Sequence, residues 1–173
     1  MIEIRKITPE TAKDLRLPNE PFSMPGRLIP ELTDGVWTYR TELFDREETM
    51  CFPEEGYDFA EYSKNGFVLG AYEADRCVGI GIFREDFLKY LYLYDLKVCA
   101  DARRKGIGSI LIRAGLEEAK KQSYLGIYCI AQDNNLNACR FYLKNGFQIG
   151  GFNNRCYDGT SQQGKADIYF YLR

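Results

Sequence analysis

A strand and a helix meet across the stretch Arg103-Arg104-Lys105-Gly106-Ile107-Gly108-Ser109, a basic turn with two glycines. Residues 90–98 before it are rich in aromatic and branched side chains, which is typical of a strand. Residues 105–122 after it carry apolar side chains at helical spacing, which predicts an amphipathic helix. The start of that helix offers backbone N–H groups and a positive dipole end, and the arginines add guanidinium donors. The stretch therefore predicts a binding site for a pyrophosphate.

Two common phosphate-binding motifs are excluded in this turn. The third glycine of a dinucleotide-binding G-x-G-x-x-G motif would stand at position 111, which is Leu111. No Gly-Lys-Ser/Thr sequence follows, so the turn is not a P-loop. A solvated basic turn with a glycine at positive φ is an alternative interpretation. The position between a strand and an amphipathic helix favours the anion site.

Length and composition indicate one folded domain. The chain has 173 residues, of which 45% are hydrophobic and 28% charged, so we expect a single domain over residues 1–173. The net charge of −2 gives no general attraction to nucleic acid or to a membrane. No apolar run is long enough to span a membrane, and no cleavable signal precedes the first strand. We therefore expect a cytoplasmic protein without nucleic-acid or membrane partners.

The chain contains no histidine, and its six cysteines form no C-x-x-C pair. These features exclude Ser-His-Asp and Cys-His hydrolases, H-E-x-x-H metalloproteases and most catalytic zinc sites. We expect no bound metal and reduced, structural cysteines. Proton transfer in this chain must use a carboxylate, Tyr, Lys, Cys or water.

The order of predicted elements indicates an α/β (α+β) fold, a mixed sheet with helices on both faces. Thr8 followed by Pro9 predicts a helix start, and further helices are predicted after Trp37 and within 47–61. Residues 18–30 carry four of the six prolines and are predicted to be irregular. Hydrophobic patterns place strands at 2–7, 67–72, 78–83, 90–98, 126–131, 147–152 and 167–172, and helices at 105–122 and 135–145.

A second motif, Asn135-x-x-Ala138-x-x-Phe141-Tyr142, starts about thirty residues after the basic turn. Asn135 and Asn137 are candidates for helix capping, or for contact with a ligand at the helix N-terminus. Tyr142 lies about 100° around the helix from Phe141, so the two rings can face different surfaces. Phe141 is typical of a core residue, whereas Tyr142 is a candidate functional group.

The two motifs together resemble the acetyl-CoA site of the GCN5-related N-acetyltransferases, the GNAT superfamily. The resemblance implies the GNAT fold with about six to seven central strands, and acetyl-CoA as the co-substrate. It implies that the basic turn holds the pyrophosphate and that the pantetheine arm runs along a bulged strand. The implied cofactor-binding residues are Leu96, Lys97, Val98, Arg103, Arg104, Lys105, Gly106, Ile107, Gly108, Ser109, Asn135, Asn137, Ala138 and Tyr142.

The same resemblance implies two catalytic roles. A backbone N–H near Val98 would polarise the thioester carbonyl. Tyr142 would point at the thioester sulfur, where a phenol with a reference pKa of about 10 can protonate the departing thiolate. The side chain of Lys97 is expected to face solvent.

Within the superfamily, the chain looks most like the streptothricin acetyltransferases. Those enzymes typically carry acidic residues at the positions of Tyr94 and Ile130, where carboxylates would attract the amine of streptothricin. The resemblance therefore implies common ancestry and leaves the acceptor open. The matching blocks are Pro21-Phe22, Gly26-Arg27-Leu28-Ile29-Pro30, Gly35-Val36-Trp37-Thr38-Tyr39, residues 132–142 and Gly150-Gly151-Phe152.

The implied reaction moves the acetyl group of acetyl-CoA to a primary amine of a small molecule, antibiotic-like or a polyamine, by direct attack in a ternary complex. An ammonium with a pKa of about 10.4 must first lose a proton. Asp95 is the first candidate for the base because it shortly precedes Val98, and Glu85 and Asp86 are the next. The candidates for the acceptor pocket are Trp37, Glu85, Tyr92 and Tyr94.

Other functions stay open at this point. The acceptor could be a peptide or protein N-terminus or an aminoglycoside, or the chain could hold CoA as a sensor without turnover. An intact Tyr142 favours an enzyme, because a sensor needs no acid for a thiolate. A nucleotide-binding regulator is disfavoured by the missing third glycine. Members of the superfamily often pair through C-terminal strands, so the resemblance also implies a homodimer.

Overall fold

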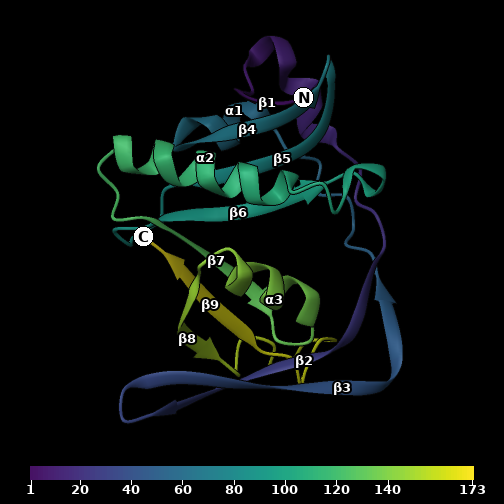
Figure 1. Cartoon of the computed structure of the whole chain (residues 1–173), viewed down its shortest axis with the longest axis vertical. Coiled ribbons are helices and arrows are strands. Elements are labelled where there is room, and N and C mark those ends of the chain that lie inside the picture. The colour runs from purple at the N-terminus through teal and green to yellow at the C-terminus, as the bar shows by residue number, and fades with distance from the viewer. The chain divides into compact units, whose positions relative to one another are not determined.

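The computed structural model describes all 173 residues, which form two compact units (Figure 1). The first unit comprises residues 1–20, 51–127 and Arg173, and the second comprises 21–50 and 128–172. None of the helices combines the length and the apolar character needed to cross a membrane.

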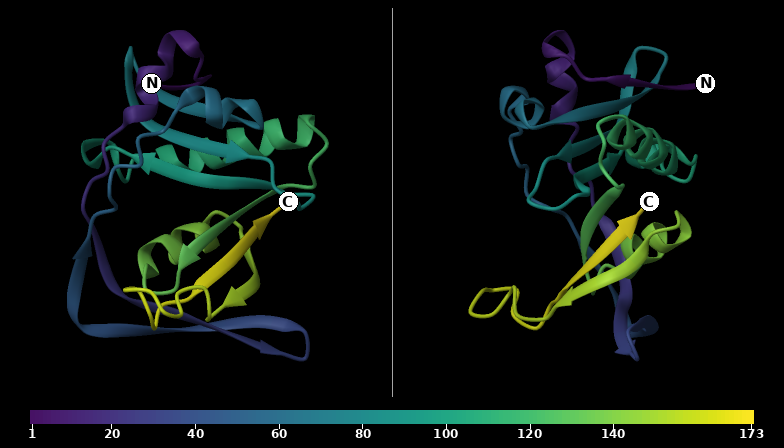
Figure 2. Two further views of the ribbon diagram at one scale, coloured as in Figure 1. Left: turned by 180° about the vertical axis from the view of Figure 1, so that it is seen from behind. Right: turned by 90° about the vertical axis from the view of Figure 1, so that its left-hand side faces the viewer.

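The sheet of the first unit consists of β1 (Ile2–Lys6), β4 (Gly66–Glu73), β5 (Arg76–Arg84) and β6 (Leu91–Val98), antiparallel and in that order. Successive residues of a strand point to opposite faces. On one face, the Phe83 ring packs against Gly115 of helix α2 (Ile107–Lys121). On the other face, the Arg84 guanidinium lies 4.8 Å over the Tyr62 ring of helix α1 (Phe59–Lys64). Helices therefore cover both faces of this sheet (Figure 2).

Short helical segments begin where the sequence supplies a cap. The predicted start at Thr8 and Pro9 is confirmed by the 3₁₀ helix η1 (Pro9–Arg16), where the Thr8 N–H donates to Thr11 Oγ1 at 2.9 Å. Helix α1 follows Asp58, whose carboxylate accepts the Ala60 N–H at 2.8 Å. A second 3₁₀ helix, η2 (Ala100–Ala102), follows β6.

Gly115 leaves the space that the Phe83 ring occupies. A Cβ at position 115 would lie 2.0 Å from Cζ of this fully buried ring. We expect Gly115→Ala to lower the free energy of unfolding by about 1–3 kcal/mol because it overpacks the core. In an open helical position the same change stabilises by about 0.5–1 kcal/mol, so the sign is diagnostic. Urea denaturation followed by circular dichroism measures it.

The control for this prediction is Glu117→Ala, an exposed position of the same helix. It should leave the free energy of unfolding almost unchanged, because surface substitutions away from special features have small effects. A Gly115→Ala variant that is as stable as the parent, or more stable, would contradict the packing described here.

The sheet of the second unit contains β7 (Ile127–Gln132), β9 (Asp167–Leu172) and β8 (Gln148–Asn153) in that order, with β8 and β9 antiparallel. Helix α3 (Leu136–Lys144) is capped by Asn135, one of the predicted candidates, whose side-chain oxygen accepts the Ala138 N–H at 3.1 Å. Gly146, at φ +88°, follows its end. The central strands number seven in all, in agreement with the prediction of about six to seven.

A long hairpin of β2 (Phe22–Thr33) and β3 (Val36–Met50) also belongs to the second unit. Two predictions are wrong here, the irregular segment at 18–30 and the helix after Trp37. The helix predicted within 47–61 begins only at Phe59. Asp34 and Gly35 connect the strands at φ +51° and +77°, so two successive residues with positive φ make a type I′ turn.

The prolines that suggested an irregular chain are accommodated in β2. Pro25 lies at a register shift, where the ladder is interrupted. The N–H of Leu28 points away from β3 and donates to the carbonyl of Asp133 at 2.9 Å. N–H groups alternate in direction along a strand, so position 30 also faces away from β3 and Pro30 removes no hydrogen bond from the hairpin.

Candidate functional site

Strand β6 carries one extra residue relative to β5. Ile82 faces Asp95, whereas the next residue, Phe83, faces Leu93, so Tyr94 has no opposite partner. This β-bulge confirms the irregularity that the family resemblance implies for the strand. Bulges re-aim side chains next to functional sites, and this one turns Asp95 toward the face of the sheet that α1 covers.

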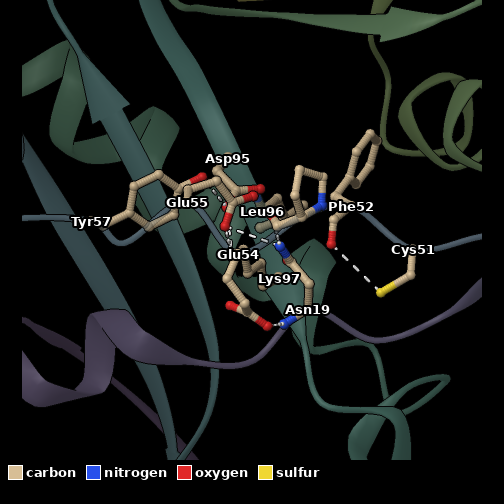
Figure 3. Close-up of polar contacts among 10 residues, drawn as sticks. Asn19, Cys51, Phe52, Glu54, Glu55, Tyr57, Asp95, Leu96 and Lys97 are labelled. Atoms are coloured by element: carbon tan, nitrogen blue, oxygen red, sulfur yellow. Dashed lines mark hydrogen bonds and ion pairs between the residues drawn. The ribbon is translucent and has the colours of Figure 1, made fainter.

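Asp95 is a largely buried carboxylate, and both of its oxygens accept hydrogen bonds. Oδ1 accepts the backbone N–H of Leu96 at 2.8 Å, and Oδ2 accepts the Tyr57 hydroxyl at 2.9 Å (Figure 3). The ammonium of Lys97 lies 3.6 Å from Oδ2. Burial raises the pKa of Asp95 above its usual range, and Lys97 and Tyr57 offset part of that effect. A carboxylate with a raised pKa suits proton abstraction from an ammonium.

Lys97 does not face solvent, and that expectation from the sequence was wrong. Only 10% of its side chain is exposed, and its ammonium donates to Oε2 of Glu55 at 2.7 Å. The same oxygen accepts the side-chain amide of Asn19 at 3.0 Å. Nζ of Lys97 also lies 4.9 Å from the centre of the Tyr57 ring, within cation–π range. Pairing with two carboxylates and a ring accounts for a buried ammonium here.

Asn19, Glu55, Tyr57, Asp95 and Lys97 form one group, called the Asp95 cluster below. Burial raises the pKa of Glu55, but hydrogen bonds from Lys97 and Asn19 outweigh it, so the pKa is lowered overall. Burial and the neighbouring Asp95 raise the pKa of Tyr57 well above that of a free phenol, so Tyr57 stays a hydroxyl donor. The cluster contains two carboxyl groups and one ammonium, so its acidic groups outnumber its basic group.

Tyrosine rings surround the Asp95 cluster. The Tyr94 ring lies 6.2 Å from that of Tyr57 and 5.5 Å from that of Tyr62. The Tyr92 ring lies 5.7 Å from Tyr94, and the Arg84 guanidinium stands 5.1 Å over the Tyr94 ring. The structure therefore brings two predicted pocket residues, Tyr92 and Tyr94, together with the predicted base.

A cavity of about 270 Å³ opens beside the Asp95 cluster. Glu55, Tyr57 and Lys97 form part of its wall, and Glu54 and Arg16 add a further acid and base. Glu54 is held by the backbone N–H of Asn19, which donates to its carboxylate at 2.9 Å. The cavity is close in size to the smaller pockets that bind organic ligands, and its charged wall suits a polar ligand group.

The predicted anion site has the required backbone geometry. Gly106 precedes α2 in the left-handed conformation at φ +79°, and Arg104 adopts φ +63°. No side chain caps α2, and its first turn contains no acidic residue. Arg103 Nε donates to the carbonyl of Val98 at 3.1 Å, which fixes the turn to the end of β6. Uncapped N–H groups at the positive end of a helix dipole fit a pyrophosphate.

The backbone N–H of Val98 points away from β5. The next residue, Cys99, donates its N–H to the carbonyl of Val78 in β5 at 2.9 Å. N–H groups alternate in direction along a strand, so that of Val98 has the opposite orientation. A group turned away from its sheet partner has the orientation that polarising a thioester carbonyl requires.

Tyr142, in the second unit, is half-buried in α3. Its ring packs 5.3 Å from Phe147 and 5.7 Å from Phe170, and its hydroxyl lies within hydrogen-bonding reach of the Cys129 thiol. Burial raises the pKa of Cys129 well above its usual range, so this group stays a thiol. A phenol hydroxyl is a hydrogen-bond donor and has the chemistry of a proton donor.

The other predicted residues of α3 hold the helix in place. Asn135 caps it through the Ala138 N–H, as described above, and the Asn137 amide donates to the carbonyl of Ser23 in β2 at 3.1 Å. These bonds are compatible with a ligand at the start of α3, because each uses only part of the amide's hydrogen-bonding capacity.

Three predicted residues lie outside the Asp95 cluster. Glu85 is exposed after β5 and accepts the Tyr124 hydroxyl at 2.8 Å. Asp86, beside it, accepts the backbone N–H of Phe87 at 2.7 Å. Trp37 stands one residue pair from the turn of the β2–β3 hairpin. None of the three is bonded to Asp95.

Three members of the Asp95 cluster escaped prediction from the sequence. Asn19, Glu55 and Tyr57 lie in connecting segments that have no hydrophobic periodicity. Asn19 reaches Glu55 across 36 residues, and Tyr57 reaches Asp95 across 38. Local sequence patterns carry no signal for such distant pairs.

The chain matches the model of the acetyltransferase (GNAT) family over residues 32–147. It is 32% identical to streptothricin acetyltransferase A of Bacillus subtilis (strain 168) over 171 residues, covering 98% of this chain and 99% of that protein. Its structure is similar to that of a Bacillus anthracis protein assigned as a streptothricin acetyltransferase, in complex with acetyl coenzyme A. That likeness has a TM-score of 0.88 at 27% identity and covers 100% of this chain and 98% of the other.

The crystal structure of nourseothricin acetyltransferase shares the fold, with a TM-score of 0.80 at 21% identity over 99% of this chain and 97% of that one. The likenesses confirm the predicted α/β fold, the family and the co-substrate. The chain belongs to the GNAT family and is an acetyl-CoA-dependent N-acetyltransferase.

Proposed function

We propose that this N-acetyltransferase acetylates a primary amine of a small cationic antibiotic of the streptothricin type and so confers resistance to it. The similarity to the Bacillus subtilis enzyme over nearly its full length supports this substrate class. The observation that carries the proposal is the Asp95 cluster beside its cavity. Acidic groups that outnumber the basic group, together with nearby tyrosine rings, suit the binding of an ammonium group.

Glu55 matters for this choice of acceptor. Tyr94 stands where the streptothricin acetyltransferases typically carry an acid, so β6 alone offers only Asp95. Glu55 comes from a different segment and shares the Lys97 ammonium with Asp95. An acceptor amine would therefore still meet two carboxylates on this face of the first unit.

In the proposed reaction, Asp95 takes a proton from the acceptor ammonium, which frees the nitrogen lone pair to attack the acetyl carbon. The Val98 N–H stabilises the charge that develops on the acetyl oxygen. The carbon–sulfur bond then breaks, and Tyr142 gives its proton to the departing thiolate. Tyr94 lies beside Tyr57 of the Asp95 cluster and Tyr92 beside Tyr94, without lining the cavity, and the two would contact the acceptor on that side. Trp37 and Glu85 are not part of the proposal.

The groups proposed to hold acetyl-CoA lie at the end of β6 and at the starts of α2 and α3. The turn at 103–109 would bind the pyrophosphate, and the backbone of 96–98 would line the pantetheine arm. Asn135, Asn137 and Ala138 at the start of α3 would contact the cofactor as well. The family model, which runs through parts of both units, supports treating residues 1–173 as one acetyltransferase domain.

The test is release of free thiol from acetyl-CoA in the presence of one amine at a time. We expect turnover with streptothricin to exceed that with an aminoglycoside, a polyamine or a short peptide. Turnover restricted to peptides would indicate an N-terminal acetyltransferase and overturn the proposed acceptor. Tight acetyl-CoA binding without turnover on any amine would indicate a sensor and overturn the proposed activity.

The basic turn gives a separate prediction for the co-substrate. Arg104→Gln is expected to weaken CoA binding about tenfold, because a charge-assisted hydrogen bond to a phosphate contributes on the order of 1.5–3 kcal/mol. The loss should shrink at high ionic strength, since exposed charges are screened. Calorimetric titration with CoA measures it. Arg155→Gln, an exposed arginine outside the turn, is the control, and equal weakening there would contradict the site.

Two further parts of the proposal concern the setting of the enzyme. We place it in the cytoplasm, where thiols such as those of Cys129 and Cys139 stay reduced. We also propose that it acts as a homodimer, and the surface for this is argued in the next subsection.

A further inference from the structure

We propose that β3 is a dimerisation strand, and that two copies of the chain pair the free edges of this strand antiparallel about a two-fold axis at Thr41. Strand β3 is 15 residues long and is hydrogen-bonded to β2 alone. Nearly all of its residues are exposed. A long exposed edge strand presents unpaired N–H and C=O groups and is a template for pairing with another chain.

The direction of the free backbone groups follows from one hydrogen bond. The Leu28 N–H points away from β3, to the carbonyl of Asp133. Leu28 is therefore in a pair that exchanges no hydrogen bonds with its partner in β3, which is Thr41. The N–H and C=O of Thr41 must then point to the open edge, as do those of Tyr39 and Leu43 by alternation.

The side chains of β3 separate into an apolar and a polar face. Tyr39, Thr41 and Leu43 share the face of the hairpin that carries the fully buried Leu28. Tyr39 is 50% exposed and Leu43 is 66% exposed. Arg40 and Glu42 lie on the opposite face. Part of this apolar face, at Tyr39 and Leu43, is therefore exposed and lies outside the buried core of its unit.

A two-fold axis at Thr41 makes the strand complementary to itself. Two residues that face each other across this axis have numbers that add up to 82. Tyr39 therefore faces Leu43 of the second copy, and Leu43 faces Tyr39 of the second copy. On the polar face, Arg40 faces Glu42 of the second copy, and the same pair recurs by symmetry. Facing pairs of this kind, apolar with apolar and base with acid, stabilise neighbouring strands.

Thr41 completes the match at the axis itself. Its N–H and C=O both point to the open edge, so the two copies can exchange a pair of hydrogen bonds there. The contact is isologous, as a two-fold dimer requires. An alternative axis at Glu42 would place that carboxylate against its own copy, and an axis at Leu43 would place Arg40 against Arg46. Both alternatives are disfavoured by like charge.

Reversing the charge at the exposed positions 40 and 42 tests this register without changing a residue of the core. Arg40→Glu places two acid–acid pairs across the axis, and Glu42→Arg places two base–base pairs there. Each variant alone is expected to raise the dimer dissociation constant about tenfold or more. Mixing the two variants restores opposite charges at both positions, so a heterodimer should form. Analytical ultracentrifugation of the full chain, whose mass is 20.0 kDa, measures each species.

Glu48→Lys is the matched control, because this exposed residue of β3 faces Met24 of β2 and lies outside the proposed pairs. It should leave the dissociation constant unchanged. Circular dichroism of each variant reports whether the hairpin keeps its fold. A monomeric parent chain would overturn the proposal, as would a dimer that both single variants leave intact, since that dimer uses another surface such as the C-terminal strands. Single variants that fail to form a heterodimer when mixed would overturn the register at Thr41.

Discussion

Asp95→Asn is expected to lower kcat for acetyl transfer about 10²- to 10⁴-fold, the range typical for loss of a general base. Asn keeps the shape of Asp95 and can still accept the Leu96 N–H, but it cannot take a proton from an ammonium. Affinity for acetyl-CoA should stay close to that of the parent. Initial rates with saturating acetyl-CoA and the best acceptor amine measure the loss.

The controls for Asp95 are the two carboxylates that the sequence offers as the next candidates. Glu85→Gln and Asp86→Asn should keep kcat close to the parent value, because these exposed groups bond to Tyr124 and to the Phe87 backbone instead. A large loss in either, with Asp95→Asn active, would assign the base to the loop after β5.

The pH profile gives an independent readout of the same group. Burial raises the pKa of Asp95, so its protonation sets in at a higher pH than for an exposed carboxylate. Activity should fall as the pH drops through this raised pKa, because protonation removes the base. The acidic limb should disappear from the residual activity of Asp95→Asn. An unchanged limb would mean that another group titrates.

Tyr142→Phe is the second substitution with a large expected effect. The phenol proposed to protonate the departing thiolate is lost, so kcat should fall about 10²-fold or more, while the KM for acetyl-CoA changes little. The ring contacts with Phe147 and Phe170 remain, so the thermal midpoint should move only slightly. Rates at varied acetyl-CoA separate kcat from KM.

Tyr169→Phe is the matched control, a half-buried tyrosine of the same unit that has no proposed role. It should keep the parent kcat. If Tyr142→Phe retained full activity, water or another group would protonate the thiolate. If the variant instead lost stability in proportion to activity, the phenol would be a structural partner of Cys129 and not an acid.

The anion turn and the elements around it were predictable because their signals are local. A glycine in the left-handed conformation, a run of basic residues and an amphipathic helix stand next to each other in the sequence, and the structure has each at the expected place. The Asn135 cap of α3 was predictable for the same reason, since the capped N–H belongs to Ala138, only three residues away.

The hairpin of the second unit was predicted wrongly, although one strong signal was present. Asp34-Gly35 is a favoured pair for a type I′ turn, but Pro25 and Pro30 argued against a strand. Their tolerance depends on the direction in which each backbone nitrogen faces, and that is settled only once the register with β3 is known. The pairing of β2 with β3 therefore outweighed the local tendency of the prolines to interrupt a strand.

The candidate base, Asp95, was predictable from the sequence, whereas most of the residues that surround it were not. Asp95 stands in a recognisable strand, whereas Glu55 and Tyr57 lie in a segment without periodicity. Lys97 shows the limit most clearly, because charge alone placed it in solvent. Glu55 and Tyr57, which come from another segment, join Asp95 in stabilising a buried ammonium there.

The extra residue in β6 reverses the alternation of side chains between the two faces of the sheet. Leu91, Leu93, Asp95 and Lys97 are all odd-numbered, and in a regular strand they would share one face. After Tyr94 the alternation is reversed. Leu91 and Leu93 therefore pack into the core beneath α2, whereas Asp95 and Lys97 reach the opposite face. Deleting this one residue would therefore send either the two leucines or Asp95 and Lys97 to the wrong face of the sheet.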